Sequence, residues 1–386
     1  MRSGWTTAVC EVRFAPRFEG EYNPAVAVQC YGLLGDLLSF ENVATQLVLQ
    51  ISRRFESVAA HDYRRSIPEH GAGPGVFADR SFLTPDAPIG VYHGLPYIEL
   101  PEAMAGHRCR VGCLVCDADV VPPGEIEVCH DSFDLVVVPS EFCRRAFQAS
   151  GLRTPVLVVP HGVGLDFQPV PDRRPDVFTF YNVYDQIRDY RKSGAELIRC
   201  FVKAFDRDPG IRLRLRTAMS GTLKAQLDEA DAWEVVTVDA HPLPELEYAR
   251  VFSEVHATVH PSKAEGFGMI PLQSLSCATP VIAPCTTGMK DYLTPDNAML
   301  LNTKGTVPAL GDTGCDVGGQ YHAIDEDHLV QCLRAMHDNW DEEAAKAVAA
   351  APGIREQYNW ARVFEPLLDI IAAQLAGSAV AGKTAS

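Results

Sequence analysis

The sequence predicts an α/β fold with more than one domain, and three observations lead to this expectation. The chain has 386 residues, which is a typical length for two or three domains. Short apolar runs alternate with amphipathic helical patterns, as expected for parallel sheets covered by helices. Near the middle of the chain, the proline-rich and charged residues 169–175 (PVPDRRP) indicate a domain boundary.

Composition narrows the possible functions and locations. A net charge of −16 disfavours a protein that holds nucleic acid by bulk electrostatics, although a local basic groove is compatible with it. The first residues, MRSGWTTAVCEV, lack a basic segment followed by a long apolar run, and no apolar stretch is long enough to span a bilayer. We therefore expect a cytoplasmic protein without integral membrane association.

Several of the 12 cysteines are close in sequence: Cys109, Cys113 and Cys116, with Cys129 nearby. Such a cluster could hold zinc, but it lies in a strand-like run without paired C-x-x-C knuckles. The interpretation that we favour is buried free thiols in a reducing cytoplasm. We expect no metal site and no cofactor.

The first half of the chain begins with a predicted βα unit. A buried strand is expected at residues 24–30 (PAVAVQC) and a helix from about residue 41 to 55, with Gly35 in the turn between them. The next strand, residues 89–92, ends at His93, and a polar residue at the carboxyl end of a parallel strand is placed to meet a ligand. His93 is either such a contact or a structural loop histidine.

Further strands are predicted at residues 110–116, 134–138 and 156–160. The first of these is followed by a D-x-D pattern at residues 117–119, which also occurs by chance in many chains. Ser140 is a good N-cap for the helix after the second strand.

The second half begins with a strand at residues 177–181 and a helix at residues 194–205. Arg188, Arg191 and Lys192 precede this helix. Basic side chains between a strand and a helix N-terminus suit a diphosphate, whereas the alternative is a solvated basic loop.

Two further strands are expected at residues 211–216 and 233–238, and a Gly-rich surface loop at residues 305–320. One face of the first strand carries only arginines, and we interpret it as a solvated or domain-facing face. These arginines are Arg212, Arg214 and Arg216.

The most informative stretch is residues 260–283, HPSKAEGFGMIPLQSLSCATPVIA, which follows an alternating apolar run. Its pattern predicts a strand, a Gly-rich loop, a helix at residues 269–278 and another strand at residues 281–283. Gly266 and Gly268 let the backbone approach a ligand closely, and the following helix N-terminus favours an anion such as a diphosphate.

Two polar side chains complete this stretch. Glu265 stands at the loop entrance as an acceptor for ligand hydroxyls, and Gln273 lies about two turns along the helix. An acceptor, a phosphate cradle and a second polar group on one ligand indicate a nucleotide sugar. The alternative is an ordinary βα crossover.

This stretch resembles the donor-site signature of GT-B retaining glycosyltransferases, the glycogen-synthase-like group often called family 4. The family pattern is Glu, Gly, Phe, Gly, a few apolar residues and a second Glu eight positions after the first. The chain has Glu265, Gly266, Phe267 and Gly268, with Gln273 in place of the second Glu. In the family the first carboxylate holds the transferred sugar and the second usually holds the ribose. Gln273 can hydrogen-bond a ribose but brings no charge.

The resemblance covers residues 24–375 approximately and implies a GT-B fold, in which two Rossmann-like domains with parallel sheets face a cleft. The acceptor-side domain would be residues 1–168 and the nucleotide-sugar domain residues 169–359. A final helix at residues 360–376 would pack back on the first domain. We expect residues 377–386 to be a disordered tail.

The implied activity is transfer of a sugar from a nucleotide diphosphate to a hydroxyl, with anomeric retention and without a metal. Lys192, aided by Arg188 or Arg191, would stabilise the departing diphosphate, and Glu265 would hold the sugar. The acceptor side would be shaped by His93 and Asp119. The donor-binding residues that the resemblance implies are Gly35, Arg191, Gly266, Phe267, Gly268, Met269, Ile270 and Gln273.

The acceptor remains open between a small molecule, a glycan and modified bases of DNA, and in the last case the arginine strand would line a groove. A second alternative is a sugar-nucleotide-binding module that has lost catalysis, with Gln273 as its first sign. A third is a sugar-phosphate synthase or phosphorylase that uses the same cleft.

Overall fold

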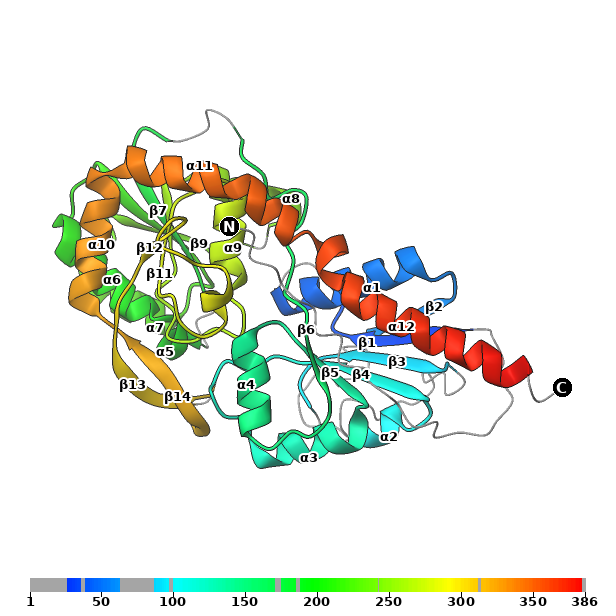
Figure 1. The fold of residues 1–386 in the computed structure, drawn as a ribbon. Coiled ribbons are helices and arrows are strands. Elements are labelled where there is room, and N and C mark those ends of the chain that lie inside the picture. The colour runs from blue at the N-terminus through cyan, green and yellow to red at the C-terminus, as the bar shows by residue number, and fades with distance from the viewer. Residues whose placement is uncertain are drawn as a thin grey trace.

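The computed structural model describes residues 26–35, 39–62, 87–96, 100–170, 175–184, 188–241, 243–311 and 314–383, with side chains up to residue 376. The described chain forms two lobes, each built on a parallel sheet (Figure 1). We call the part built on the first sheet the first domain and the part built on the second sheet the second domain.

The first sheet has six parallel strands in the order β2-β1-β3-β4-β5-β6. The chain enters at β1 and reverses direction across the sheet between β1 and β3, which makes this pair the topological switch point. Strand β2 was not foreseen from the sequence. The strands are β1 (Val28–Gly32), β2 (Val58–Asp62), β3 (Ile89–His93), β4 (Cys109–Cys113), β5 (Leu135–Val138) and β6 (Val156–Val158), and the helices are α1 (Ser39–Arg54), α2 (Leu100–Met104), α3 (Pro123–Ser132) and α4 (Glu141–Ala149).

The second sheet also has six parallel strands, in the order β12-β11-β10-β7-β8-β9. Read from β9, this is the 3-2-1-4-5-6 order of dinucleotide-binding folds, and its switch point lies between β7 and β10. The strands are β7 (Phe178–Val183), β8 (Ile211–Arg216), β9 (Val236–Asp239), β10 (Ala257–Val259), β11 (Val281–Ala283) and β12 (Met299–Leu300), and the helices are α5 (Asp189–Lys192), α6 (Gly194–Phe205), α7 (Gly221–Glu229), α8 (Glu245–Ser253), α9 (Met269–Ser276), the 3₁₀ helix η3 (Thr287–Asp291) and α10 (Glu326–Asp338).

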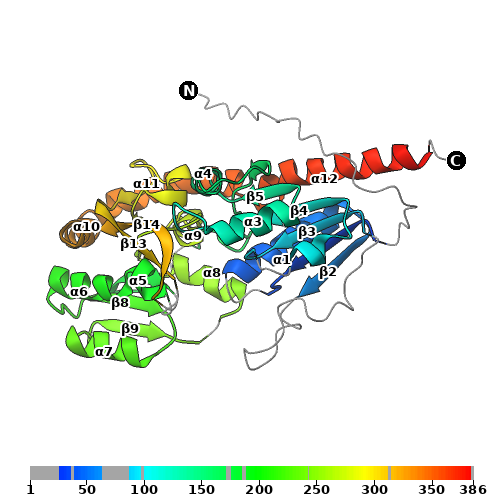
Figure 2. The ribbon, with the colours of Figure 1, turned by 90° about the horizontal axis from the view of Figure 1, so that it is seen from below.

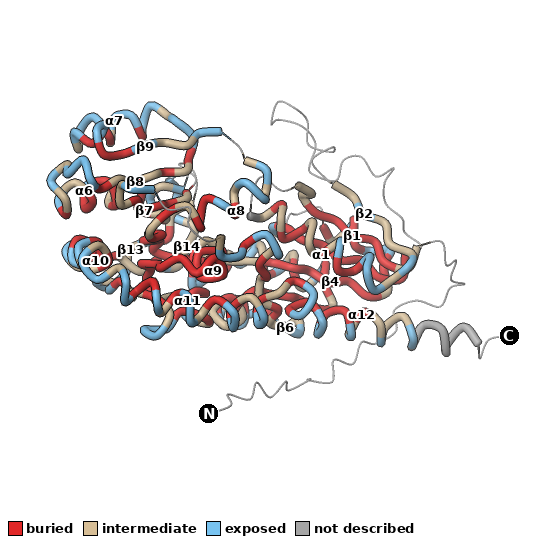
Figure 3. The backbone as a smooth tube through the Cα atoms, turned by 90° about the horizontal axis from the view of Figure 1, so that it is seen from above, coloured by how far each residue is buried: buried red, intermediate tan, exposed pale blue. Residues whose placement is uncertain are grey.

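Both sheets are buried on their two faces by helices, as Figure 3 shows from the red interior of each lobe. On β8 the leucines Leu213 and Leu215 are fully buried, while the arginines between them stay half-buried. A fully buried leucine contributes roughly 1.5–3 kcal/mol to folding, so the alternation fixes the register of this strand. The predicted alternation of arginines and leucines is therefore confirmed, and on the arginine face Arg214 pairs with Asp239 of the same domain at 2.5 Å.

The Gly-rich residues 305–320 are not a surface loop as predicted. They belong to an antiparallel hairpin of β13 (Thr303–Leu310) and β14 (Asp316–Ile324), which projects from the second domain toward α4 of the first (Figure 1). Register shifts interrupt the pairing next to Thr306 and Pro308. These irregularities, together with the glycines, hide the alternation that normally marks a strand.

Two C-terminal helices close the fold. Helix α11 (Trp340–Gln357) covers the second domain, and α12 (Trp360–Lys383) runs back along the first domain beside α1 (Figure 2). Both helices pack through apolar side chains. An exposed ion pair of 3.3 Å also joins Arg54 of α1 to Asp369 of α12. The helix continues to Lys383, past the predicted end at residue 376 and into the segment expected to be disordered. Among the described helices, none is long and apolar enough to cross a membrane.

Candidate functional site

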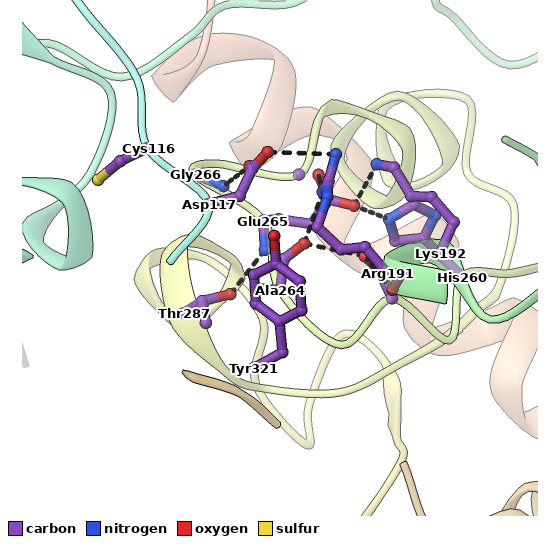
Figure 4. Close-up of polar contacts among 12 residues, drawn as sticks. Cys116, Asp117, Arg191, Lys192, His260, Ala264, Glu265, Gly266, Thr287 and Tyr321 are labelled. Atoms are coloured by element: carbon purple, nitrogen blue, oxygen red, sulfur yellow. Dashed lines mark hydrogen bonds and ion pairs between the residues drawn. The ribbon is translucent and has the colours of Figure 1, made fainter. Parts of the chain in front are cut away.

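The Glu265 carboxylate gathers the basic side chains of the site (Figure 4). Its Oε1 accepts a hydrogen bond from Lys192 Nζ and lies 2.9 Å from Nε2 of His260. Its Oε2 lies 3.4 Å from a guanidinium nitrogen of Arg191. The Glu265 side chain is 9% exposed, so these basic groups replace most of the water that an ionised carboxylate requires.

These four side chains meet because they follow the two strands of the second switch point. Arg191 and Lys192 lie after β7, and His260 and Glu265 lie after β10, which is the neighbour of β7 in the sheet. Connections leave these two strands in opposite directions, which opens a crevice at their carboxyl ends. The topology therefore assembles residues that are about 70 positions apart in the sequence.

The charges of the site follow from this geometry. Burial acts to raise the pKa of Glu265, but Lys192 and Arg191 outweigh it, so this pKa lies well below its ordinary value. Burial lowers the pKa of His260, against the opposing effect of Glu265. Because a carboxylate only accepts hydrogen bonds, the neutral His260 carries its proton on Nε2. The site thus holds an ionised Glu265 at neutral pH.

The three basic residues before α6, Arg188, Arg191 and Lys192, differ in their burial and contacts. Arg191 is buried, donates to the carbonyl oxygen of Ala264 at 2.7 Å, and reaches Glu265. Lys192 lies beside it on the same carboxylate. Arg188 is exposed at the N-cap of α5, and its side chain is not among the groups around Glu265. Of the two arginines considered as partners of Lys192, the structure places Arg191 next to it.

Besides the predicted close approach to a ligand, Gly266 meets a second requirement, which is close contact with the first domain. A Cβ at this position would lie 2.2 Å from Val115 Cγ2 and 2.8 Å from the carbonyl oxygen of Cys116, both in the first domain. The backbone of Gly266 is bound from the same side, because its oxygen accepts from Ser140 Oγ at 2.6 Å. Glycine is therefore needed here for contact between the domains.

The residues after Gly266 are mostly packing residues. Phe267 is buried among aromatic rings, with its ring centroid 5.4 Å from that of Tyr292. Gly268 has a φ of 90°, and a Cβ there would lie 2.5 Å from Met289 Cγ. Met269 is buried and Ile270 is half-buried on α9. The side chains at these positions therefore shape the loop by packing.

Gln273 lies on α9 and is buried. Its Oε1 accepts a hydrogen bond of 3.3 Å from the hydroxyl of Tyr248 on α8. The guanidinium of Arg216 lies over the Tyr248 ring, with its carbon 5.1 Å from the ring centroid. Gln273 therefore belongs to a neutral hydrogen-bonded group, with one cation beside it, at the position where the family signature has a second carboxylate.

The first-domain residues named from the sequence lie apart from the ion cluster. Gly35 is bound to α1 through Thr45, with a bond of 2.9 Å from its N–H to the hydroxyl. His93 is buried against the Phe40 ring, at 4.5 Å between ring centroids, and burial lowers the pKa of His93 to about 4. Asp119 accepts a bond of 2.7 Å from the backbone N–H of Gln320 on the hairpin. None of these three residues is in contact with the Glu265 carboxylate in the described structure.

Three residues at the site were not among the site residues predicted from the sequence. Asp117, two positions before Asp119, accepts a bond of 2.8 Å from the N–H of Gly266 and lies 3.2 Å from Arg191. Thr287 accepts the N–H of Glu265 at 3.0 Å and so fixes the loop from its other side. The third is His260, which directly follows β10, whereas His93 is the last residue of β3.

The cysteine cluster forms no metal centre within the described residues. Cys109, Cys113 and Cys129 are buried free thiols, and burial raises the pKa of Cys109 and of Cys129 to about 12. Such thiols are poor ligands and poor nucleophiles near neutral pH. Cysteine side chains in this region therefore pack as small apolar groups.

A family model described as "Family 4 Glycosyltransferase in conflict systems" matches residues 125–367 of the chain. A D-inositol 3-phosphate glycosyltransferase of Frankia alni is 30% identical over 200 residues, which cover 49% of this chain and 42% of that protein. A protein of the same name from Nocardiopsis dassonvillei is 25% identical over 309 residues, covering 72% of this chain and 65% of that one. The chain thus aligns with less than two thirds of the length of either relative.

The fold has a match among solved structures. The Anabaena protein Alr3699/HepE in complex with UDP and glucose superposes with a TM-score of 0.65 at 12% identity, over 90% of this chain and 99% of that one. This likeness concerns the fold, and it confirms the predicted GT-B arrangement of two Rossmann-like domains.

Proposed function

The chain belongs to the family 4 glycosyltransferases of conflict systems, and from this premise we propose that it moves a sugar from a nucleoside-diphosphate donor to a hydroxyl acceptor. We further propose that the anomeric configuration is retained and that no metal takes part. The observation that carries this proposal is the Glu265 carboxylate, held by Lys192, Arg191 and His260 at the switch point of the second sheet.

Glu265 suits the sugar because its carboxylate is ionised and its position is fixed. Its low pKa keeps it an acceptor for sugar hydroxyls at neutral pH. Its backbone is bound at both ends, by Thr287 Oγ1 at 3.0 Å and by the N–H of Gly288 at 2.9 Å. A sugar held on this carboxylate is oriented without reorganisation of the loop.

Lys192 and Arg191 suit the leaving group. The bond between the anomeric carbon and the diphosphate oxygen breaks, and its electron pair stays on the diphosphate, whose growing charge these cations stabilise. The acceptor oxygen bonds to the anomeric carbon on the same face, and its proton passes to the departing phosphate oxygen. The step needs no protein nucleophile, and it is balanced in atoms and charge.

The donor class to test first is a uridine diphosphate sugar, since the Anabaena structure holds UDP and glucose. The DNA-modifying alternative has less support, because Arg214 is paired with Asp239 and Arg216 lies on Tyr248. An acceptor that carries hydroxyls remains the proposal, as either a small molecule or a glycan. Gln273 stands where the family signature has a second carboxylate, so the test must also distinguish an enzyme from a sugar-nucleotide-binding module.

The test measures nucleotide release from a panel of nucleotide sugars, with water as the default acceptor, together with the anomer of the released sugar by NMR. We expect turnover with at least one donor, and a loss of at least about a hundredfold in Lys192→Ala, the scale of one missing transition-state contact. Lys224→Ala, an exposed lysine on α7, is the matched control and should behave as wild type. Binding without turnover would favour the binding module, and full turnover in Lys192→Ala would overturn the assignment.

A further inference from the structure

A carboxylate of the first domain reaches the basic residues of the second. Asp117 follows β4, and one of its oxygens accepts the N–H of Gly266 at 2.8 Å while the other lies 3.2 Å from Arg191 (Figure 4). The Arg191 side chain is 9% exposed, whereas that of Asp117 is 35% exposed. Both carboxylate oxygens of Asp117 thus have partners in the second domain, while part of its side chain is exposed.

This arrangement resembles the way in which a protein binds a phosphate. A backbone N–H of a Gly-rich loop and an arginine guanidinium are the donors that phosphate oxygens use, and here both act on a side-chain carboxylate. The charges also balance, because Asp117 and Glu265 oppose Arg191 and Lys192. With Asp117 in place, the charged groups of the site offer a diphosphate no net positive charge.

We propose that Asp117 is an internal competitor of the donor diphosphate, and that it sets how tightly the protein holds anions at Arg191 and the Gly266 N–H. This inference rests on the proposed function, in which Arg191 and Lys192 meet the diphosphate. A bound diphosphate takes over the donors that Asp117 uses, and Asp117 turns its carboxylate to solvent. Arg191 keeps its place meanwhile, because Ala264 and Glu265 also hold it.

The competition is also coupled to the contact between the domains. Asp117 belongs to the first domain, and both of its partners belong to the second. Each time a nucleoside diphosphate leaves, re-formation of the Asp117 contacts compensates for those that are lost. A protein built in this way binds its donor more weakly and releases the leaving diphosphate more readily than one with a neutral residue at position 117.

Asp119 provides a matched control from the same D-x-D pattern. It too carries a carboxylate from the first domain to the second, but it binds the N–H of Gln320 on the hairpin. Replacement of Asp119 therefore removes a comparable interdomain contact and an equal charge, without a change next to Arg191. Any effect of net charge alone appears equally in both variants.

The experiment measures inorganic pyrophosphate binding by calorimetry at fixed ionic strength, for the wild-type full chain, D117N and D119N. We expect D117N to bind pyrophosphate about tenfold more tightly, the scale by which one neighbouring charge shifts an equilibrium, and D119N to match wild type. Pyrophosphate affinity in D117N that is equal to or below that of wild type overturns the proposal, as does undetectable binding in all three proteins. D117A, which also frees the Gly266 N–H, must show the same gain if D117N is poorly folded.

Pyrophosphate carries neither nucleoside nor sugar, so the two proposals fail separately. A gain in D117N without turnover of any nucleotide sugar would leave the competitor in place and remove the proposed transfer activity. Turnover by the wild-type protein, with no increase in pyrophosphate affinity in D117N, would support the transfer activity and overturn the proposed competition by Asp117. A merely structural role for Asp117 predicts weaker binding in the variants, because the loop would lose an anchor.

Discussion

The two sheets place polar residues at their switch points by the same geometry, yet the outcomes differ. Between β7 and β10, the second sheet gathers Glu265 with Lys192 and Arg191, all charged. Between β1 and β3, the first sheet holds His93, whose pKa is lowered by burial to about 4, near His161, whose pKa is lowered by burial to about 3. The carboxyl edge of a sheet thus decides where a side chain lies, and its neighbours decide whether it is charged.

The contrast also separates what each switch point can do. A buried ion cluster retains its charge because the partners replace water, so it can interact with a charged or hydroxylated ligand. Neutral imidazoles, of which His93 is buried and His161 half-buried, contribute shape and packing. We expect four substitutions or conditions to sharpen this contrast, and the first has the largest effect.

Glu265→Gln removes the central carboxylate and leaves Arg191 and Lys192 buried against each other. We expect a loss of about 3–5 kcal/mol in unfolding free energy, the usual cost of one broken buried ion pair, together with a loss of donor binding. Urea unfolding followed by fluorescence measures the first effect. Glu343→Gln is the control, because Glu343 is a similarly buried carboxylate whose partner Lys346 is 33% exposed. Equal losses in both variants would contradict the special role of the cluster.

Gly266→Ala tests the contact between the loop and the first domain. A Cβ 2.2 Å from Val115 Cγ2 must displace the first domain or the loop, and overpacking of this kind costs about 3 kcal/mol at the upper end of its range. Gly353→Ala on α11 is the matched change, since nothing lies within 4 Å of a Cβ there. It should be neutral or stabilise the protein by up to about 1 kcal/mol. Similar melting temperatures for the two variants would show that Gly266 is not wedged between the domains.

His93 makes the stability depend on pH. Its folded pKa of about 4 lies below the unfolded value of 6.5, so the unfolded chain binds the proton first as the pH falls. Its contribution is complete above pH 6.5 and is reduced by about 2 kcal/mol at pH 5. We expect His93→Gln to lose less unfolding free energy than wild type between pH 7.5 and pH 5. Parallel losses in the two proteins would assign the acid sensitivity to other groups.

Asp119→Ala should have the smallest effect. Asp119 is exposed and supplies one acceptor to the hairpin, so its loss should cost about 0.5 kcal/mol. Hydrogen exchange of the Gln320 amide, which we expect to become faster, is the most direct measurement. An unchanged exchange rate would mean that the hairpin is held by its other contacts.

The sequence predicted the second domain better than the first, for physical reasons that single residues illustrate. Glu265 and Gly266 were found because their loop is local, so spacing along the chain is spacing in the structure. The partnership of Asp117 with Gly266 spans 149 positions, and no periodicity carries that information. His260 was within reach of the rule applied to His93, because both lie at the carboxyl side of a parallel strand, His93 as the last residue of β3 and His260 directly after β10. The two histidines differ because His260 has a carboxylate, Glu265, five residues later in the sequence and in contact with its ring.

The hairpin shows a second kind of limit. The glycines in β13 and β14 predict a loop on local preference alone, and only pairing between the two strands overrides it. Tyr321 on β14 packs with Ala118 of the first domain and Ala264 of the second, and these contacts depend on the assembled domains. Local sequence therefore specifies the site loop but not the element that covers its flank.

The two chain crossings between the domains lie side by side, and this limits how the molecule can move. Val163, on the way out of the first domain, donates to the carbonyl oxygen of Tyr358 at 2.7 Å and pairs with Asn359, on the way back. A Cβ on Gly162 would lie 2.5 Å from the Trp360 ring. Two adjacent connections allow the domains to rotate about one axis, and they resist twisting or sliding of one domain against the other. The relative motion of the domains that costs the least free energy is then rotation about this one axis. Each closure returns Asp117 to its contacts with Gly266 and Arg191.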